Sequence, residues 1–130
     1  MRTPVTLTLA ALLAISGCSS LGRPPGTRET DRQANTIADA IGYPHQPNAA
    51  GLARAALFTT RGSSGGFRVL EAKDLPTKDL LAPSAELTIL LHTDETHGAL
   101  GTTPALTACY RLVFNYYGVL RPASRVRCPR

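Results

Sequence analysis

The chain is poor in the residues that build most recognition surfaces and metal sites. Its 130 residues include no tryptophan, three phenylalanines, four tyrosines and three cysteines, and no two cysteines form a C-x-x-C pair. The missing pairs argue against a structural zinc site, and the missing tryptophan argues mildly against a carbohydrate-stacking surface. No uncharged apolar run reaches the ~20 residues that a membrane-spanning helix needs.

Fingerprints of common enzymes are missing as well. The stretch 62–66 matches G-x-S-x-G around Ser64, but that motif needs a strand before it and a helix after it. The flanking patterns predict the reverse order, so the stretch is typical of a linker. No Lys-Ser or Lys-Thr follows these glycines, which excludes a phosphate-binding loop. These absences argue against an enzyme and leave the question open.

Charge points to no particular partner. Lys and Arg number 14 against 9 for Asp and Glu, and no nucleic-acid recognition motif is present, so we predict no nucleic-acid partner. A group of arginines near the C-terminus has two interpretations. It lies against anionic lipid or an anionic envelope polymer, or it belongs to a solvated strand. The group comprises Arg121, Arg125, Arg127 and Arg130.

The first eighteen residues have the pattern of an export signal. Arg2 is followed by eleven uncharged, largely apolar residues, Val5 to Ile15, and then by Ser16, Gly17 and Cys18. The run Ile15-Ser16-Gly17-Cys18 resembles the lipobox of bacterial membrane lipoproteins, which reads branched aliphatic, small, small, cysteine. The resemblance implies cleavage before Cys18 and a diacylglyceryl group on its sulfur. It also implies a mature chain anchored on the extracytoplasmic face of the cell membrane.

The lipobox divides the chain into three parts. Residues 1–17 are the signal peptide, and residues 18–27 are a flexible Ser-, Gly- and Pro-rich tether. Residues 28–130 are left as one small domain. Several acyl chains on Cys18 hold such a protein firmly at a bilayer surface, because each buried methylene contributes ~0.8 kcal/mol. Loss of Arg2 with the signal lowers the formal net charge from +5 to +4.

Assigning Cys18 to lipid turns an odd cysteine count into a pair, Cys109 and Cys128. Disulfides persist outside the cytoplasm, so we predict that these two residues are bonded; two free thiols are the alternative. Strands are predicted over 107–117 and 124–129. Placing Cys109 directly opposite Cys128 puts a two-residue turn at Gly118-Val119, where a type II′ turn favours glycine.

This register brings apolar and charged residues to one face. The first strand places Tyr110, Leu112, Phe114 and Tyr116 there, and the second places Arg121, Arg125 and Arg127 there. Arginine stems packing across the aromatic rings would reconcile the two strands. A bulge near Pro122 that flips part of the second strand would do so as well. The aromatic residues themselves are either core or a stacking surface for a ligand.

The middle of the chain predicts two helices and two more strands. Thr30 and Gln33 are spaced as a capping box, although a start at Thr27 is also possible, and Ala34, Ile37, Ala38 and Ile41 form an apolar stripe. A second helix is predicted over 48–58, capped by Asn48, and strands over 67–75 and 86–94. The expected fold is α+β, with two N-terminal helices followed by an antiparallel sheet of about four strands.

One polar cluster suggests a metal site. His92 and Asp94 share a strand face, a turn brings His97 back beside them, and His45 is a further candidate ligand. Imidazole and carboxylate ligands suit divalent ions such as zinc. A polar hairpin loop closed by Gly98 needs the same residue types, and we expect no other cofactor. The leading hypothesis is therefore a non-catalytic lipoprotein that binds an envelope partner or ligand, with metal binding as the alternative.

Overall fold

The structure is a computed structural model that describes residues 27–43, 45–61, 65–120 and 122–130. The predicted signal peptide, Cys18 and all of the tether but Thr27 lie outside these residues, as do Ser64 and Arg121. In the described part, no helix has the length and apolar character needed to cross a membrane.

Within the described residues the order of elements is two helices and then seven strands, so the α+β class is confirmed. The sheet contains five strands, not four, and a separate two-stranded ribbon extends beyond it. The elements are α1 (Thr27–Ile41), α2 (Ala49–Thr59), β1 (Gly66–Asp74), β2 (Ala85–Thr93), β3 (Thr96–Gly98), β4 (Gly101–Thr103), β5 (Leu106–Asn115), β6 (Gly118–Val119) and β7 (Ser124–Val126).

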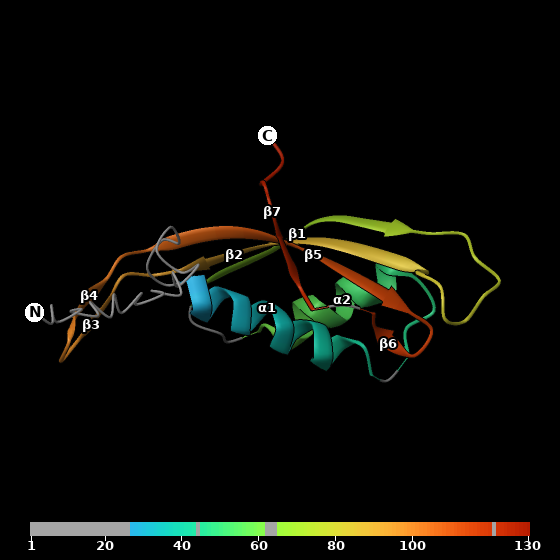
Figure 1. The fold of residues 1–130 in the computed structure, drawn as a ribbon, viewed down its shortest axis with the longest axis horizontal. Coiled ribbons are helices and arrows are strands. Elements are labelled where there is room, and N and C mark those ends of the chain that lie inside the picture. Colours follow the sequence, from blue (N-terminus) through green and yellow to red (C-terminus); the bar gives the residue numbers. More distant parts are fainter. Residues whose placement is uncertain (1–26, 44, 62–64, 121) are drawn as a thin grey trace, which may run out of the picture.

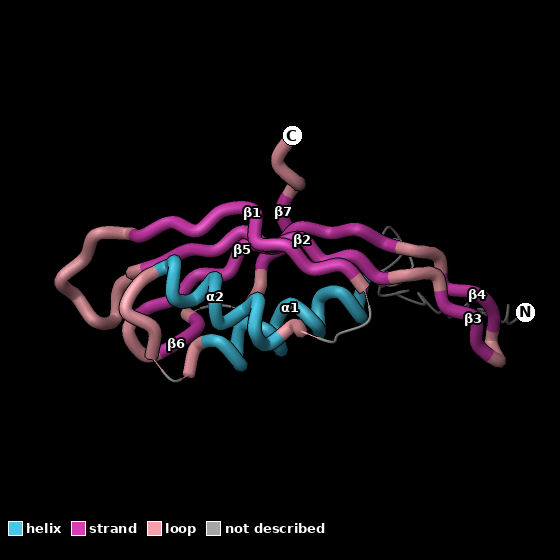
Figure 2. The backbone as a smooth tube through the Cα atoms, turned by 180° about the vertical axis from the view of Figure 1, so that it is seen from behind, coloured by secondary structure: helices cyan, strands magenta, loops and turns pink. Residues whose placement is uncertain are grey.

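The molecule is an elongated two-layer sandwich. Both helices cover one face of the sheet, whose order is β1-β2-β5-β6 with β7 also paired to β5 (Figures 1 and 2). The β3–β4 ribbon projects from one end, and the β1–β2 connection and the β5–β6 turn lie at the other. The predicted strands 67–75 and 86–94 are confirmed as β1 and β2, and β2 is a central strand as its apolar sequence indicates.

The core lies between the helices and one face of β2 and β5. Alternate residues of these two strands point toward the helices, because successive side chains of a strand face opposite sides. The predicted stripe of α1 supplies the facing surface, so this prediction is confirmed. The buried set is Ala34, Ile37, Ala38 and Ile41 from α1, Leu52 and Ala56 from α2, Leu87, Ile89 and Leu91 from β2, and Tyr110, Leu112 and Phe114 from β5.

The two helix starts differ in how well the sequence indicates them. Helix α1 begins at Thr27, so Thr30 lies one turn inside it and is not the cap. Thr30 is fully buried and donates a hydrogen bond to the Thr27 carbonyl at 3.0 Å. Helix α2 is capped as predicted, because Asn48 Oδ1 accepts from the Gly51 amide at 2.8 Å.

The C-terminal hairpin has a different register from the one predicted. Cys109 lies opposite Val126, and Asn115 opposite Gly118, so the turn consists of Tyr116 and Tyr117. Gly118 follows the turn with a φ of 136°, a conformation that favours glycine. The Leu120 amide bonds the Val113 carbonyl, and Ser124 lies opposite Arg111. The returning chain therefore uses four positions where β5 uses two, which leaves two extra residues between Leu120 and Ser124.

Within this stretch of the returning chain, Ala123 contacts α1 instead of β5. The Ala123 amide donates to Asn35 Oδ1 at 2.8 Å, a contact that no pattern within the hairpin indicates. A shift of two residues preserves the faces, so Arg125 stays on the same side as Tyr110. Its guanidinium donates to Thr27 Oγ1 at 3.1 Å, at the start of α1. The charge conflict is thus resolved by a helix contact, not by a flip of the strand.

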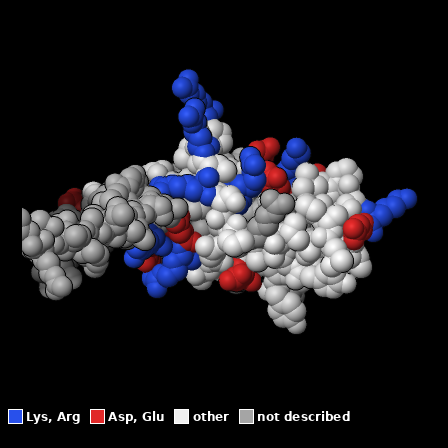
Figure 3. Space-filling model, viewed as in Figure 1, with Lys and Arg blue, Asp and Glu red and all other residues white. Residues whose placement is uncertain are grey.

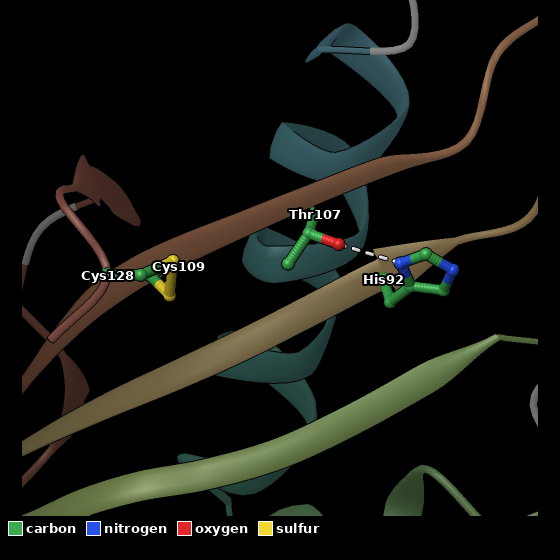
Figure 4. Close-up of a disulfide and its surroundings, with 4 residues drawn as sticks. All are labelled: His92, Thr107, Cys109 and Cys128. Carbon is green, nitrogen blue, oxygen red and sulfur yellow. Dashed lines mark hydrogen bonds between the residues drawn. A yellow bond between two sulfur atoms is a disulfide. The ribbon is translucent and has the colours of Figure 1, made fainter. Parts of the chain in front are cut away.

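The predicted disulfide is present. Cys109 and Cys128 are bonded, with their Cα atoms 5.2 Å apart, and Cys109 is fully buried. The bond lies on the sheet face away from the helices, as the close-up in Figure 4 shows. It therefore holds the last residues of the chain against the centre of β5.

Candidate functional site

The end of the molecule opposite the β3–β4 ribbon exposes a group of large apolar side chains. Leu80, Leu81, Tyr116 and Tyr117 are 50, 68, 44 and 65 % exposed, respectively. Together with His45 they form what we call the aromatic end. They come from three separate connections: α1–α2, β1–β2 and β5–β6. Contiguous exposed apolar surface of this kind on a small protein commonly marks an interaction site.

Backbone and ring contacts join the three connections. The Tyr116 amide donates to the Leu80 carbonyl at 3.3 Å, and Asn115 Nδ2 donates to the Leu81 carbonyl at 3.3 Å. The His45 ring packs on Tyr116 with centroids 4.2 Å apart, and Tyr117 meets Tyr116 edge-on at 5.3 Å. The aromatic end is therefore one connected surface and not a set of isolated side chains.

Short turns hold the leucines outward. Asp79 Oδ1 accepts from the Leu81 amide at 2.9 Å, and Thr77 Oγ1 accepts from the Asp79 amide at 3.1 Å. Such turns satisfy backbone hydrogen bonds locally, and the two leucine side chains remain exposed to solvent. Beneath them is a small pocket of about 170 Å³, whose lining includes His45, Leu80 and Tyr116.

The surface charge is arranged around this end. In Figure 3 basic and acidic groups are interspersed over the middle of the molecule, and basic groups stand on the projecting C-terminus. On the face shown there, the end that carries the β1–β2 connection has few Lys, Arg, Asp or Glu side chains apart from groups at its tip. An apolar surface with a charged margin is typical of a protein interface.

The predicted aromatic group is divided between two roles. Tyr110 and Phe114 are buried in the core, which confirms the packing interpretation for them. Tyr116 and Tyr117 are exposed at the turn, so only these two remain available for a ligand. The sequence analysis missed Leu80 and Leu81; their only signal was a pair of leucines in a segment otherwise rich in turn residues.

The Tyr110 hydroxyl joins the helices to the sheet from within the core. It lies 2.8 Å from Thr30 Oγ1 and donates to Asp31 Oδ1 at 2.6 Å. Burial, and secondly the hydrogen bond to Asp31, raise the pKa of Tyr110 to about 12. This tyrosine is thus a structural group that remains protonated at neutral pH.

The polar cluster around His92 lies at the other end of the sheet, near the ribbon. His92 Nδ1 is 2.7 Å from Thr107 Oγ1 across the β2–β5 pair (Figure 4), and its Nε2 is 3.4 Å from Asp94 Oδ1. His97 lies on β3, where its Nδ1 is 3.0 Å from Thr102 Oγ1. The segment predicted as a polar loop closed by Gly98 is therefore the start of a second ribbon.

This cluster has part of what a nucleophilic or metal site needs. A hydroxyl, an imidazole and a carboxylate lie in sequence, as in a hydrolase. However, Asp94 and Thr107 are both exposed, and water competes for every charge that such a site would stabilise. Among the residues that the structure describes, no three His, Cys, Asp or Glu side chains are grouped to hold an ion. Metal binding by His92, Asp94 and His97 stays a prediction, and His45 belongs to the aromatic end.

A hollow of about 530 Å³ lies between α1, the end of α2 and the start of β1. Ile37, Phe67 and Leu91 contribute apolar surface, while Arg32 and Thr36 contribute polar groups. It is wide and open, and no buried charged group points into it among the described residues. Its volume is within the range of ligand pockets, but its chemistry selects no particular ligand.

No known protein family, no curated protein and no solved structure matches this chain. Its own residues therefore carry the functional inference.

Proposed function

We propose that the protein is an extracytoplasmic lipoprotein, anchored by lipid on Cys18, whose small domain binds an envelope protein through the aromatic end without catalysing a reaction. The observation that carries the binding proposal is the connected, exposed surface of Leu80, Leu81, Tyr116 and Tyr117. Burying apolar surface contributes roughly 25 cal/mol per Å², and aromatic side chains dominate the energetics of many interfaces.

The lipobox supports the location, and the fold supports the geometry. Helix α1 begins at Thr27, nine residues after Cys18, and runs toward the aromatic end, where Gly42 lies against Gly118. The first described residue, Thr27, and the proposed binding surface are thus at opposite ends of α1. The aromatic end is therefore not at the end of α1 where the chain enters the domain.

The test is site-specific cross-linking in cells that produce the full chain. A photoreactive side chain replaces Leu81 or Tyr117 in separate variants, and Leu100 in a control. Leu100 is fully exposed at the tip of the β3–β4 ribbon, at the opposite end. We expect a discrete cross-linked species from positions 81 and 117 and none from position 100. Equal cross-linking at all three positions, or no cross-linking at any of them, would contradict the proposal.

A further inference from the structure

Helix α2 has a second apolar surface that the core does not use. Leu52 and Ala56 of this helix are buried, but Leu57 and Phe58 are 50 and 72 % exposed. A helix of a small domain normally presents polar residues to water on that side. Packing within the domain therefore does not explain why this leucine and this phenylalanine lie on the surface.

Two arginines flank this apolar pair. Arg54 precedes Leu57 and Phe58 by three and four residues, so helical spacing brings these three side chains together, and Arg61 follows just after α2 ends at Thr59. They line one shallow hollow, and the Arg61 guanidinium carbon is 5.5 Å from the centroid of the Phe58 ring. No acidic residue occurs between Ala49 and Arg61. We call Arg54, Leu57, Phe58 and Arg61 the α2 patch.

The α2 patch lies near the entry of the chain into the domain. Thr59 and Thr60, next to the patch, line a hollow together with Arg32 and Thr36 of α1, and Arg32 is only five residues after Thr27. From Thr27 back to Cys18 the chain has nine residues, which span at most roughly 30 Å. A lipid on Cys18 therefore keeps Thr27, where the chain enters the domain, within about 30 Å of the bilayer.

We propose that the α2 patch rests on an anionic lipid surface and so orients the anchored domain. This rests on the proposed lipid anchor. An apolar pair inserted at the headgroup boundary, with arginines on either side to meet anionic headgroups, is the composition of a membrane-surface helix. A second copy of the chain fits less well, because a two-fold contact through this patch would bring Arg54 and Arg61 of both copies together without an acidic residue from α2.

The absence of tryptophan makes a clean test possible. Phe58→Trp places a single reporter in the patch, and Tyr117→Trp places one at the aromatic end, where a comparably exposed ring is replaced. The full lipidated chain is reconstituted into phosphatidylcholine vesicles with or without phosphatidylglycerol. Flotation of the vesicles, tryptophan emission and quenching by lipids brominated on their acyl chains are measured on the same samples.

We expect the tryptophan at position 58 to have a blue-shifted emission and to be quenched in vesicles with phosphatidylglycerol, and the tryptophan at position 117 to have neither property. Adding Arg54→Glu and Arg61→Glu to the Phe58→Trp chain should remove both effects. Equal quenching at the two positions, none at position 58, or quenching unaffected by charge reversal overturns the inference. So does a blue shift at position 58 that depends on protein concentration without vesicles, which indicates self-association.

Flotation separates this inference from the function on which it rests. A chain that floats with the vesicles while the tryptophan at position 58 stays exposed retains its anchor and overturns only the role of the α2 patch. A chain that does not float overturns both the anchor and the patch.

Discussion

Tyr110 links helix α1 to the sheet through its hydroxyl. Its ring is in the core, and its hydroxyl meets Thr30 and Asp31 of α1 without any exposed surface. The sequence indicates a strand residue here but not its polar partners, because nearly 80 residues separate Tyr110 from α1. Contacts of that separation are set by the packing of whole elements.

We expect Tyr110→Phe to lower the free energy of unfolding by about 1–2 kcal/mol, because a buried hydrogen bond to a charged group is lost while the ring still packs. Urea unfolding of the two proteins measures this difference. Tyr117→Phe is the matched control, since its ring is exposed at the turn and should leave the midpoint unchanged. Equal stability of the Tyr110→Phe variant and the unchanged chain would contradict the role given to the hydroxyl.

The raised pKa of Tyr110 also predicts a pH dependence. Because the folded state holds the proton more tightly than the unfolded state, this contribution is complete below the unfolded pKa of about 10. It declines as the pH rises toward the folded pKa of about 12. Stability should therefore fall more steeply between these pH values in the unchanged chain than in Tyr110→Phe. Parallel pH profiles of the two unfolding midpoints would refute this assignment.

At the scale of elements, helix α2 depends on a contact from the sheet. Asp74, at the end of β1, accepts a hydrogen bond from the Ala49 amide at 2.7 Å, at the positive end of the helix. Asn48 caps the same turn from within the helix sequence. The Asn48 cap was visible in the sequence because it is local, whereas Asp74 is 25 residues away and was not.

We expect Asp74→Ala to destabilise the domain by about 1 kcal/mol. The substitution leaves the Ala49 amide without its carboxylate acceptor and removes a favourable contact with the helix dipole. Thermal unfolding followed by circular dichroism measures the loss. The neighbouring Lys73→Ala serves as control, because Lys73 is exposed and should change the midpoint little. Similar effects of the two substitutions would argue against a capping role for Asp74.

The disulfide links β5 covalently to the chain that follows β7. It closes a loop with a sequence separation of 19, for which chain entropy predicts a stabilisation of ~3 kcal/mol. Cys128→Ser should therefore lower the melting temperature by about 10 °C or more in a domain of this size. Reduction of the unchanged chain should reproduce the shift, and an unshifted melting curve in both experiments would show that the bond constrains little.

The elements themselves were largely predictable, and their register was not. Apolar periodicity indicated α1, the Asn48 cap and alanine content indicated α2, and strand-forming or apolar composition indicated β1, β2 and β5. The hairpin register failed because the Ala123 amide bonds Asn35, a helix residue, so the return chain leaves the ladder for part of its length. The β3–β4 ribbon was missed because its exposed residues carry no apolar pattern.

At the scale of the whole molecule, the candidate site was the least predictable feature. The aromatic end brings together Leu80, Tyr116 and His45 from three connections, and no sequence spacing relates them. The proposed attachment, in contrast, rests on Ile15 to Cys18 alone, because the lipobox that these residues resemble is a short contiguous pattern. Location was therefore open to inference from local sequence, whereas the interaction surface needed the assembled fold.

The proposed anchor and the fold should be separable. Cys18 lies outside the described residues and nine residues before α1, so we expect Cys18→Ser to leave the melting temperature of the domain unchanged while abolishing its attachment to membranes. Fractionation of cells into membrane and soluble material measures the second effect. Retention of the variant in the membrane fraction would count against attachment through Cys18.

The intact mass of the chain extracted from membranes tests the central proposal most directly. The account predicts a protein that begins at Cys18 and carries the added mass of a diacylglyceryl group on that residue, with the Cys109–Cys128 disulfide formed. An unmodified Cys18, or an N-terminus at any other residue, would contradict it.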